Sequence, residues 1–288
     1  MGRVFSIEQI HDYAESIPTP EDFNYAVEHF EQAVNEEIEA ENVDGALIYG
    51  SVAIKAFTLR SDLDCLIVPY DHSTQSLDAI ARILKASNPS GRIEMSAIVH
   101  PRSRLRSGAH EIDRYFGSHL SGPARLVYGE DPAEYMHYPD YGSKTHLLAY
   151  LRHKKRSVAT GFTSEGPELY KGLQRILELP LAIGRKTLRV LDEMNGTQAA
   201  TADSANKNII VPSSLELFDS FGLADVPRTI IELDRSYSEV LKGMLNGTTI
   251  EIEYADILRE IQSEGGRASE WLDAVDDALV TRLRGRRS

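Results

Sequence analysis

Two short polar motifs near the start of the chain have the residue types that bind a metal-complexed phosphate. Gly50-Ser51 follows the apolar segment 46–49, and Asp62 and Asp64 come after a gap of ten residues, where a second apolar segment begins. Glycine lets a phosphate approach the main chain because it has no Cβ, and the N–H groups of the following turn and the Ser51 hydroxyl can bind the phosphate oxygens. Alternate residues of a strand share a face, so both carboxylates should project from one side of a sheet. Carboxylate and phosphate oxygens together suit Mg²⁺.

A third carboxylate, Glu94, completes this set. Polar and apolar residues alternate over 92–100, which predicts a third strand with Glu94 and Ser96 on its polar face. If that strand lies beside the Asp pair, two Mg²⁺ ions about 4 Å apart could stabilise the attacking and leaving oxygens of an in-line displacement. Glu94 would then bind the second ion or accept the proton of the attacking hydroxyl.

The elements that must position these residues form an α/β (α+β) head with a short mixed sheet, followed by an all-helical second half. Apolar spacing predicts a helix over 21–40, and Cys65 should be buried in a strand. We divide the chain into domains 1–142 and 143–288, and we expect Pro180 to kink or split a long helix. The other predicted elements are strands at 46–50, 63–70, 92–100 and 124–129, helices at 51–57 and 74–87, helices at 146–158, 168–194, 229–245 and 254–283, and a loop at 196–208.

Composition narrows the classes of protein. The chain has 288 residues, a net charge of −13 and a single cysteine, which excludes an internal disulfide and a multi-thiolate metal site. No apolar run reaches the roughly 18 residues of a membrane span and no signal-peptide pattern opens the chain, so we expect a cytoplasmic protein with no membrane partner. An acidic average speaks against tracking long nucleic acid. Two basic clusters, 102–106 and 152–156, could nevertheless bind a phosphate backbone, whereas the arginine-rich end 282–287 is interpreted as a solvated tail.

Gly50-Ser51, the ten-residue gap and Ser61-Asp62-Leu63-Asp64, followed by apolar 65–68, resemble the signature of the polymerase-β nucleotidyltransferase superfamily. Segment 93–99 is similar to the third-carboxylate strand of the aminoglycoside adenylyltransferases, and the resemblance covers roughly residues 21–135. It implies that Gly50 and Ser51 bind the triphosphate of an NTP such as ATP, that Asp62 and Asp64 hold metal, and that Glu94 supplies the third carboxylate. Many small members of the superfamily have Arg-Gly where this chain has Ile54-Lys55.

Cations that could neutralise the triphosphate are Lys55, Lys154, Lys155 and Lys171. Lys55 follows the Gly50-Ser51 motif closely. Lys171 lies in the long predicted helix after the domain boundary, from which a side chain could reach across a cleft to the nucleotide. We therefore take Lys55 and Lys171 as the nucleotide-binding cations.

The acceptor of the nucleotide stays open at this point. One hypothesis is transfer to a small cationic molecule such as an aminoglycoside, which an acidic cleft would attract. The other is transfer to a macromolecule, because the chain also resembles toxin-type nucleotidyltransferases of toxin–antitoxin pairs, which modify tRNA ends or adenylylate proteins and have an antitoxin partner. We favour tRNA because of the two basic clusters. A third class, a catalytically silent binding module, has no need of three carboxylates.

Overall fold

The computed structural model describes residues 17–110, 112, 120, 124–138, 143–163, 167–195, 207–248 and 251–285. Within them the chain forms one mixed sheet of four strands and ten helices, so it belongs to the mixed α and β class, with helix predominating. The chain divides into two compact units between Asp140 and Tyr141. That the segments 1–142 and 143–288 are separate domains stays a prediction.

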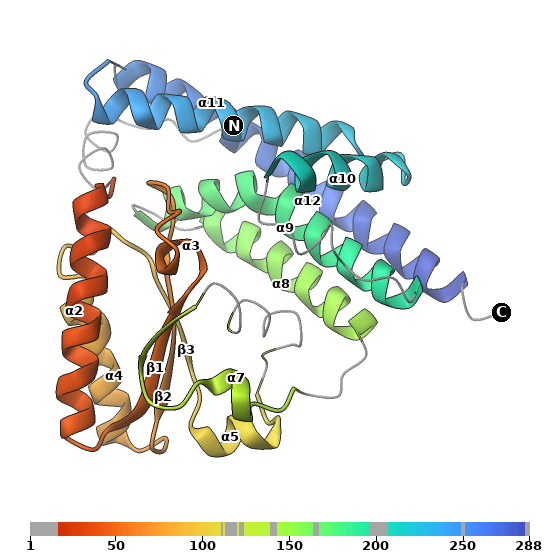
Figure 1. Ribbon diagram of the computed structural model, residues 1–288. Helices are drawn as coiled ribbons and strands as arrows, with labels where there is room; N and C mark the ends of the chain where they lie inside the picture. The colour runs from red at the N-terminus through yellow and green to blue at the C-terminus, as the bar shows by residue number, and fades with distance from the viewer. Residues whose placement is uncertain are drawn as a thin grey trace. The chain divides into compact units, whose positions relative to one another are not determined.

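The first unit contains the sheet, in the strand order β3-β2-β1-β4 (Figure 1). Strand β1 is antiparallel to β2 and β4, and β2 is parallel to β3. The predicted strands are confirmed, with ends that differ by a few residues. The elements are α2 (Pro20–Glu39), β1 (Val43–Tyr49), α3 (Gly50–Ala53), β2 (Leu63–Pro69), α4 (Thr74–Ser87), β3 (Met95–Val99), α5 (Arg102–Ser107), β4 (Arg125–Tyr128) and α7 (Pro132–Tyr135).

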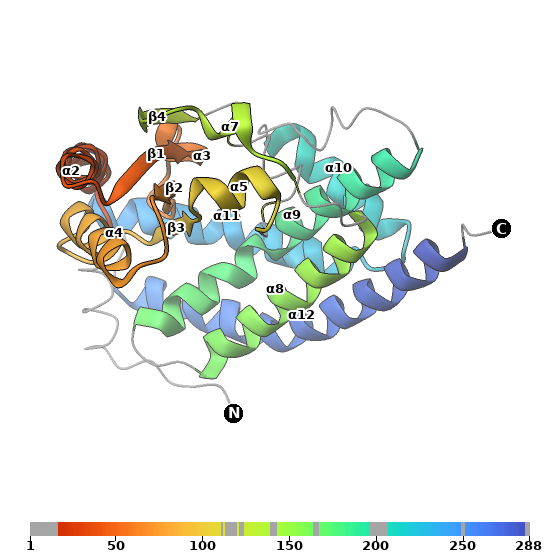
Figure 2. The same cartoon turned by 90° about the horizontal axis from the view of Figure 1, so that it is seen from below.

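Helix α2 begins with a reciprocal cap. The Asp22 N–H donates to the Thr19 hydroxyl at 3.3 Å, and the Thr19 N–H donates to the Asp22 carboxylate at 2.8 Å. Pro20 occupies the first turn, where its missing N–H costs nothing. The helix buries one face against the sheet and packs beside α4, as Figures 1 and 2 both show. An ion pair joins the two helices, with Arg82 Nε 2.6 Å from Glu37 Oε1.

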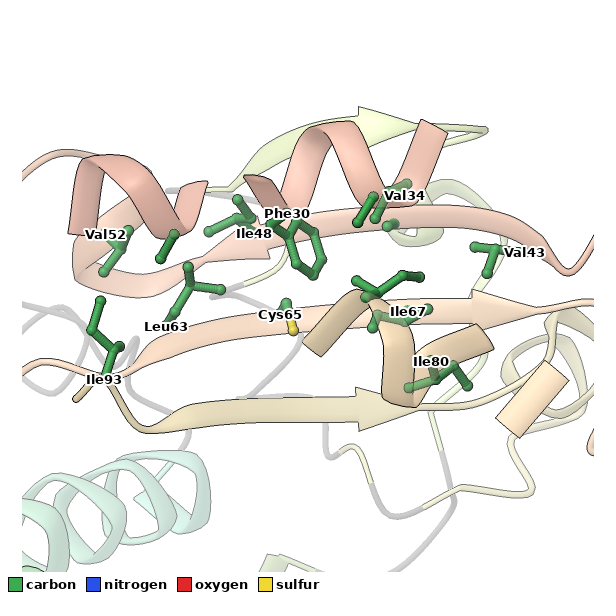
Figure 3. Packing of buried hydrophobic residues seen from close by; sticks show 14 of the residues in the cluster. Phe30, Val34, Val43, Ile48, Val52, Leu63, Cys65, Ile67, Ile80 and Ile93 are labelled. Carbon is green, nitrogen blue, oxygen red and sulfur yellow. The ribbon is translucent and has the colours of Figure 1, made fainter. Parts of the chain in front are cut away.

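The two faces of the sheet carry two different cores. On one face, Ile48, Cys65 and Ile67 pack against residues of α2 and α4, as Figure 3 shows. Cys65 is fully buried there, as predicted. The opposite face carries Leu47 and Leu66, which pack in a second cluster with side chains from α5 and α7. Because neighbours along a strand face opposite ways, Asp64 lies on this second face, opposite from α2 and α4.

Three expectations about the elements need correction. Helix α3 ends at Ala53 rather than near residue 57, because Lys55 adopts the left-handed conformation (φ 57°), which an α-helix cannot contain. Strand β3 begins at Met95, so Glu94 precedes the strand instead of lying within it. Pro180 does not split the long helix, which is continuous from Pro167 to Asn195; the proline removes one N–H donor from it, and the alternative expectation of a kink stays a prediction.

All described elements of the second unit are helices. Helices α8, α9 and α12 run side by side in both views (Figures 1 and 2). Trp271 is buried, and its indole N–H donates to the Leu223 carbonyl at 3.0 Å. Most of the predicted loop at 196–208 lies outside the described residues. The helices are α8 (Ser143–Thr163), α9 (Pro167–Asn195), α10 (Lys207–Asp219), α11 (Asp225–Leu245) and α12 (Glu251–Gly285).

None of the helices in the described ranges combines the length and the apolar character that a membrane span requires.

Candidate functional site

The end of β1 and the start of β2 bring Gly50 against Asp64. Tyr49 is the register partner of Asp64 in the antiparallel pair, so the next residue, Gly50, turns directly over the carboxylate. Gly50 has a φ of 75°, and a Cβ added to it would lie 2.7 Å from Asp64 Oδ2. Both the left-handed backbone and the contact require glycine here. The carboxylate therefore lies directly beside bare main chain.

The connection between the two motifs is closed by hydrogen bonds at its ends. The Ser51 hydroxyl donates to Ser61 Oγ at 3.1 Å, and the Thr58 N–H donates to the same oxygen at 2.9 Å. The Ser61 N–H in turn donates to the Thr58 carbonyl at 3.0 Å. Ser61 thus holds a turn, and the Ser51 hydroxyl is directed to the loop. Any phosphate contact of Ser51 must use its main-chain N–H or a rotated hydroxyl.

The three predicted carboxylates lie at the same end of the neighbouring strands β2 and β3. The Leu63 N–H donates to the Glu94 carbonyl at 2.9 Å, and Asp64 pairs with Ser96, which sets Glu94 level with Asp62. Asp64 lies within β2, whereas Asp62 and Glu94 directly precede β2 and β3. The two aspartates are half-buried and Glu94 is exposed.

The three carboxylates do not close into one metal-binding group. Over the described ranges, no three or more His, Cys, Asp or Glu side chains are arranged to hold a metal ion together. The structure therefore places the three residues at the starts of β2 and β3 without assembling them into one metal-binding group in the described ranges.

Tyr49 is a site residue that the sequence reasoning missed. Its ring is 4% exposed, and burial, together with the negative charges of Asp64 and Asp62, raises the pKa of its phenol far above the ordinary value. The phenol stays protonated, and both carboxylates are close enough to act on it. Its position immediately before Gly50, at the end of a buried strand, is the signal that could have identified it.

Burial and the neighbouring Asp64 charge likewise raise the pKa of the Cys65 thiol. A protonated, buried thiol is inert, so Cys65 belongs to the core and not to the chemistry of the site.

Of the two predicted nucleotide-binding lysines, Lys55 has a described side chain and Lys171 does not. Lys55 is exposed and follows α3 directly, on the same connection as Ser51. Lys171 falls in α9 of the second unit, and its side chain lies outside the described residues. Its role at the triphosphate stays a prediction.

Two arginines of the first basic cluster, Arg102 and Arg106, contact other side chains of the first unit. Arg102 Nε donates to Asp44 Oδ2 at 2.6 Å, and its Nη1 donates to Glu130 at 2.5 Å. The guanidinium carbon lies 4.8 Å from the centre of the Tyr135 ring, and that of Arg106 lies 5.4 Å from it. Tyr135 therefore packs within the fold.

This cluster is also remote from Gly50. Asp44 precedes Tyr49 by five residues on β1, which corresponds to about 16 Å along a strand. Arg102 is thus anchored at the opposite end of the strand from the Asp64 carboxylate.

The second basic cluster lies on α8 and is partly engaged. Lys155 forms an ion pair with Asp273 of α12, and Lys154 Nζ lies 5.5 Å from the centre of the Tyr150 ring. Arg152 and Arg156 are exposed. The arginine-rich end beyond residue 285 lies outside the described residues.

No protein-family model matches this chain. A comparison with curated proteins likewise finds no match. The resemblance to nucleotidyltransferases therefore rests on the residues and their spacing.

Proposed function

We propose that this protein is a Mg²⁺-dependent nucleotidyltransferase of the polymerase-β type, which moves a nucleoside monophosphate from an NTP to an acceptor hydroxyl and releases pyrophosphate. The contact between the Gly50 main chain and the Asp64 carboxylate carries the proposal. It sets phosphate-binding main chain beside a metal-binding oxygen, so one triphosphate can use both. By contrast, a Cβ added to Gly45 or Gly129 would meet only main-chain atoms of the β1–β4 strand pair.

The residues present fit Mg²⁺. Proteins usually bind this ion through one or two carboxylates, with substrate phosphates and water completing the shell. Asp62 and Asp64 supply two carboxylates at the start of β2, both partly accessible to solvent. When bound there, Mg²⁺ would neutralise charge on the triphosphate and make the α-phosphorus more electrophilic.

The chain's own residues then have separate tasks. The main-chain N–H groups of Gly50 and Ser51 bind the triphosphate oxygens, and Lys55 adds positive charge. Glu94, exposed beside Asp62, accepts the proton of the acceptor hydroxyl as its oxygen attacks the α-phosphorus. The bond from the α-phosphorus to the bridging oxygen breaks, and pyrophosphate leaves with the electron pair. Tyr49 packs beneath the carboxylates and keeps water from their buried side.

The acceptor we propose is tRNA, as for a toxin of a toxin–antitoxin pair with an antitoxin protein as partner. This now depends on the α8 cluster, where Arg152 and Arg156 are exposed, because Arg102 is engaged with Asp44 and Glu130. That internal use of Arg102 favours the alternatives. They are a small cationic acceptor of the aminoglycoside type, which the net charge of −13 would attract, or a protein hydroxyl.

The experiment is transfer from each α-³²P-labelled NTP, with Mg²⁺, to tRNA, to an aminoglycoside or to protein. Asp64→Ala should abolish labelling, and Asp78→Ala, which alters an exposed aspartate on α4, should leave it unchanged. Label on one acceptor that depends on Asp64 supports the proposal and names that acceptor. Full activity of Asp64→Ala would sink the metal assignment.

A further inference from the structure

Helix α9 buries two arginines one turn apart. Arg189 is only 7% exposed, and Arg185 lies four residues before it and is half-buried. Residues four apart share one face of a helix, and like charges there destabilise it. Arg185 is thus half-buried beside another positive charge.

The Arg185 side chain has an unsatisfied hydrogen-bond donor. Its Nε atom is buried without a hydrogen-bond partner in the described part of the chain. Burial, followed by the positive charge of Arg189, lowers its pKa, while Tyr150 acts in the opposite direction. A partly desolvated charge of this kind is costly unless an opposite charge binds it.

Two more cations gather at the same place. The Tyr150 ring of α8 lies 5.1 Å from Lys186 Nζ of α9 and 5.5 Å from Lys154 Nζ of its own helix. The ring thus contacts one lysine from each helix of the α8–α9 hairpin, and Lys186 directly follows Arg185 in the chain. We call Arg185, Lys186, Lys154 and Tyr150 the Tyr150 cluster.

We propose that the Tyr150 cluster is a binding site for a phosphate group, with Arg185 as its principal ligand. A guanidinium presents N–H groups in a fork that matches phosphate oxygens, and a phosphate carries enough charge to be shared by several cations. A single carboxylate would neutralise only one of them.

All members of the Tyr150 cluster lie on α8 and α9 of the second unit. Arg185 follows Lys171 by 14 residues on α9, about 21 Å along a helix. The inference does not depend on the proposed function, because it rests on the helical hairpin alone.

The first test is calorimetric titration of the full-length protein with inorganic pyrophosphate in EDTA. Arg185→Met should weaken binding roughly tenfold or more, as loss of a charged hydrogen bond does. The matched control is Arg259→Met, which removes an exposed arginine on α12 that pairs with Asp256; it should bind as the wild type does. Equal affinities of the wild type and Arg185→Met, or no binding to the wild type, would overturn the proposal.

Thermal unfolding supplies a readout that a structural role would not produce. Without anion, Arg185→Met should be at least as stable as the wild type, because it removes a half-buried charge with an unsatisfied donor. Pyrophosphate should raise the midpoint of the wild type and have much less effect on the variant. A variant that is less stable without anion would show that Arg185 holds the fold, and would contradict a ligand site.

Two sources of the phosphate can then be separated in the same buffer. Arg185-dependent binding of ATP would identify a nucleotide phosphate. Arg185-dependent preference for a 5′-phosphorylated RNA oligonucleotide over its 5′-hydroxyl form would identify a terminal phosphate of an acceptor. Because no Mg²⁺ or turnover is involved, a protein that transfers no nucleotide can still pass these tests.

Discussion

Replacing Gly50 with alanine tests whether the Gly50 turn positions the Asp64 carboxylate. The substitution has two costs, one from the left-handed backbone and one from the contact with Asp64. Alanine in the left-handed region costs about 1–2 kcal/mol, partly offset by about 0.4–1 kcal/mol from a less flexible unfolded chain. The new Cβ would also lie 2.7 Å from Asp64 Oδ2, so the carboxylate must move by about 0.7 Å to restore an ordinary contact. Rotating it off its preferred rotamer adds about 0.5–1.5 kcal/mol.

Gly91 supplies the control. Its φ is 69°, but a Cβ there would meet nothing within 4 Å. Urea unfolding should therefore show a loss of roughly 1 kcal/mol for Gly91→Ala and up to about 1.5 kcal/mol more for Gly50→Ala. Transfer to the acceptor should be normal in Gly91→Ala. It should fall roughly 10- to 100-fold in Gly50→Ala, since a displacement of about 1 Å at a reacting centre can cost that much.

A double-mutant cycle isolates the contact. In an Asp64→Ala background, Gly50→Ala should cost only as much stability as Gly91→Ala does, because no carboxylate remains to be displaced. If Gly50→Ala transfers nucleotide as fast as Gly91→Ala, the Gly50 contact does not position Asp64 and the reasoning fails.

Three further predictions concern charged side chains of the first unit. Glu94→Gln should slow transfer about 10²- to 10⁴-fold in single-turnover assays with NTP binding unchanged; an unaltered rate would make Glu94 an ordinary surface residue. The hydrogen bond from Arg82 holds the pKa of Glu37 below its ordinary value of 4.5, so the stability it contributes is present above that pH and is lost as the pH falls through the lower folded pKa. Urea titrations below pH 4.5 should show Glu37→Gln converging with the wild type, and parallel curves would contradict this. Arg102→Met should lower the free energy of unfolding by about 1–3 kcal/mol by leaving Asp44 unpaired, whereas Arg104→Met, an exposed change, should stay within about 0.5 kcal/mol.

Local spacing in the sequence was enough to predict the elements of the head. The helix over 21–40 was predictable because Phe23, Phe30 and Val34 recur at helical spacing and all three are buried. Burial of Cys65 followed from its place in an apolar strand. These features depend on neighbours along the chain, so their signals survive without knowledge of the tertiary fold.

Features that depend on tertiary partners were harder to predict. The cluster at 102–106 resembled a nucleic-acid patch because the sequence does not show that Asp44 and Glu130 fold against Arg102. The role of Tyr49 depends on its pairing with Asp64, fifteen residues away. The turn at Lys55 ended a helix that was expected to run from 51 to 57. In each case a long-range contact or a backbone angle decided the outcome.

The hydrogen bond between Ser51 and Ser61 ties the two ends of a short connection to each other. Its inner residues are anchored in the core as well, because Val52 is buried there and the Phe57 ring stacks on Phe23 with the ring centres 4.6 Å apart. Residues 54–56, by contrast, are exposed. Variation that alters the charge beside the Gly50 turn without disturbing the scaffold is therefore confined to these three positions.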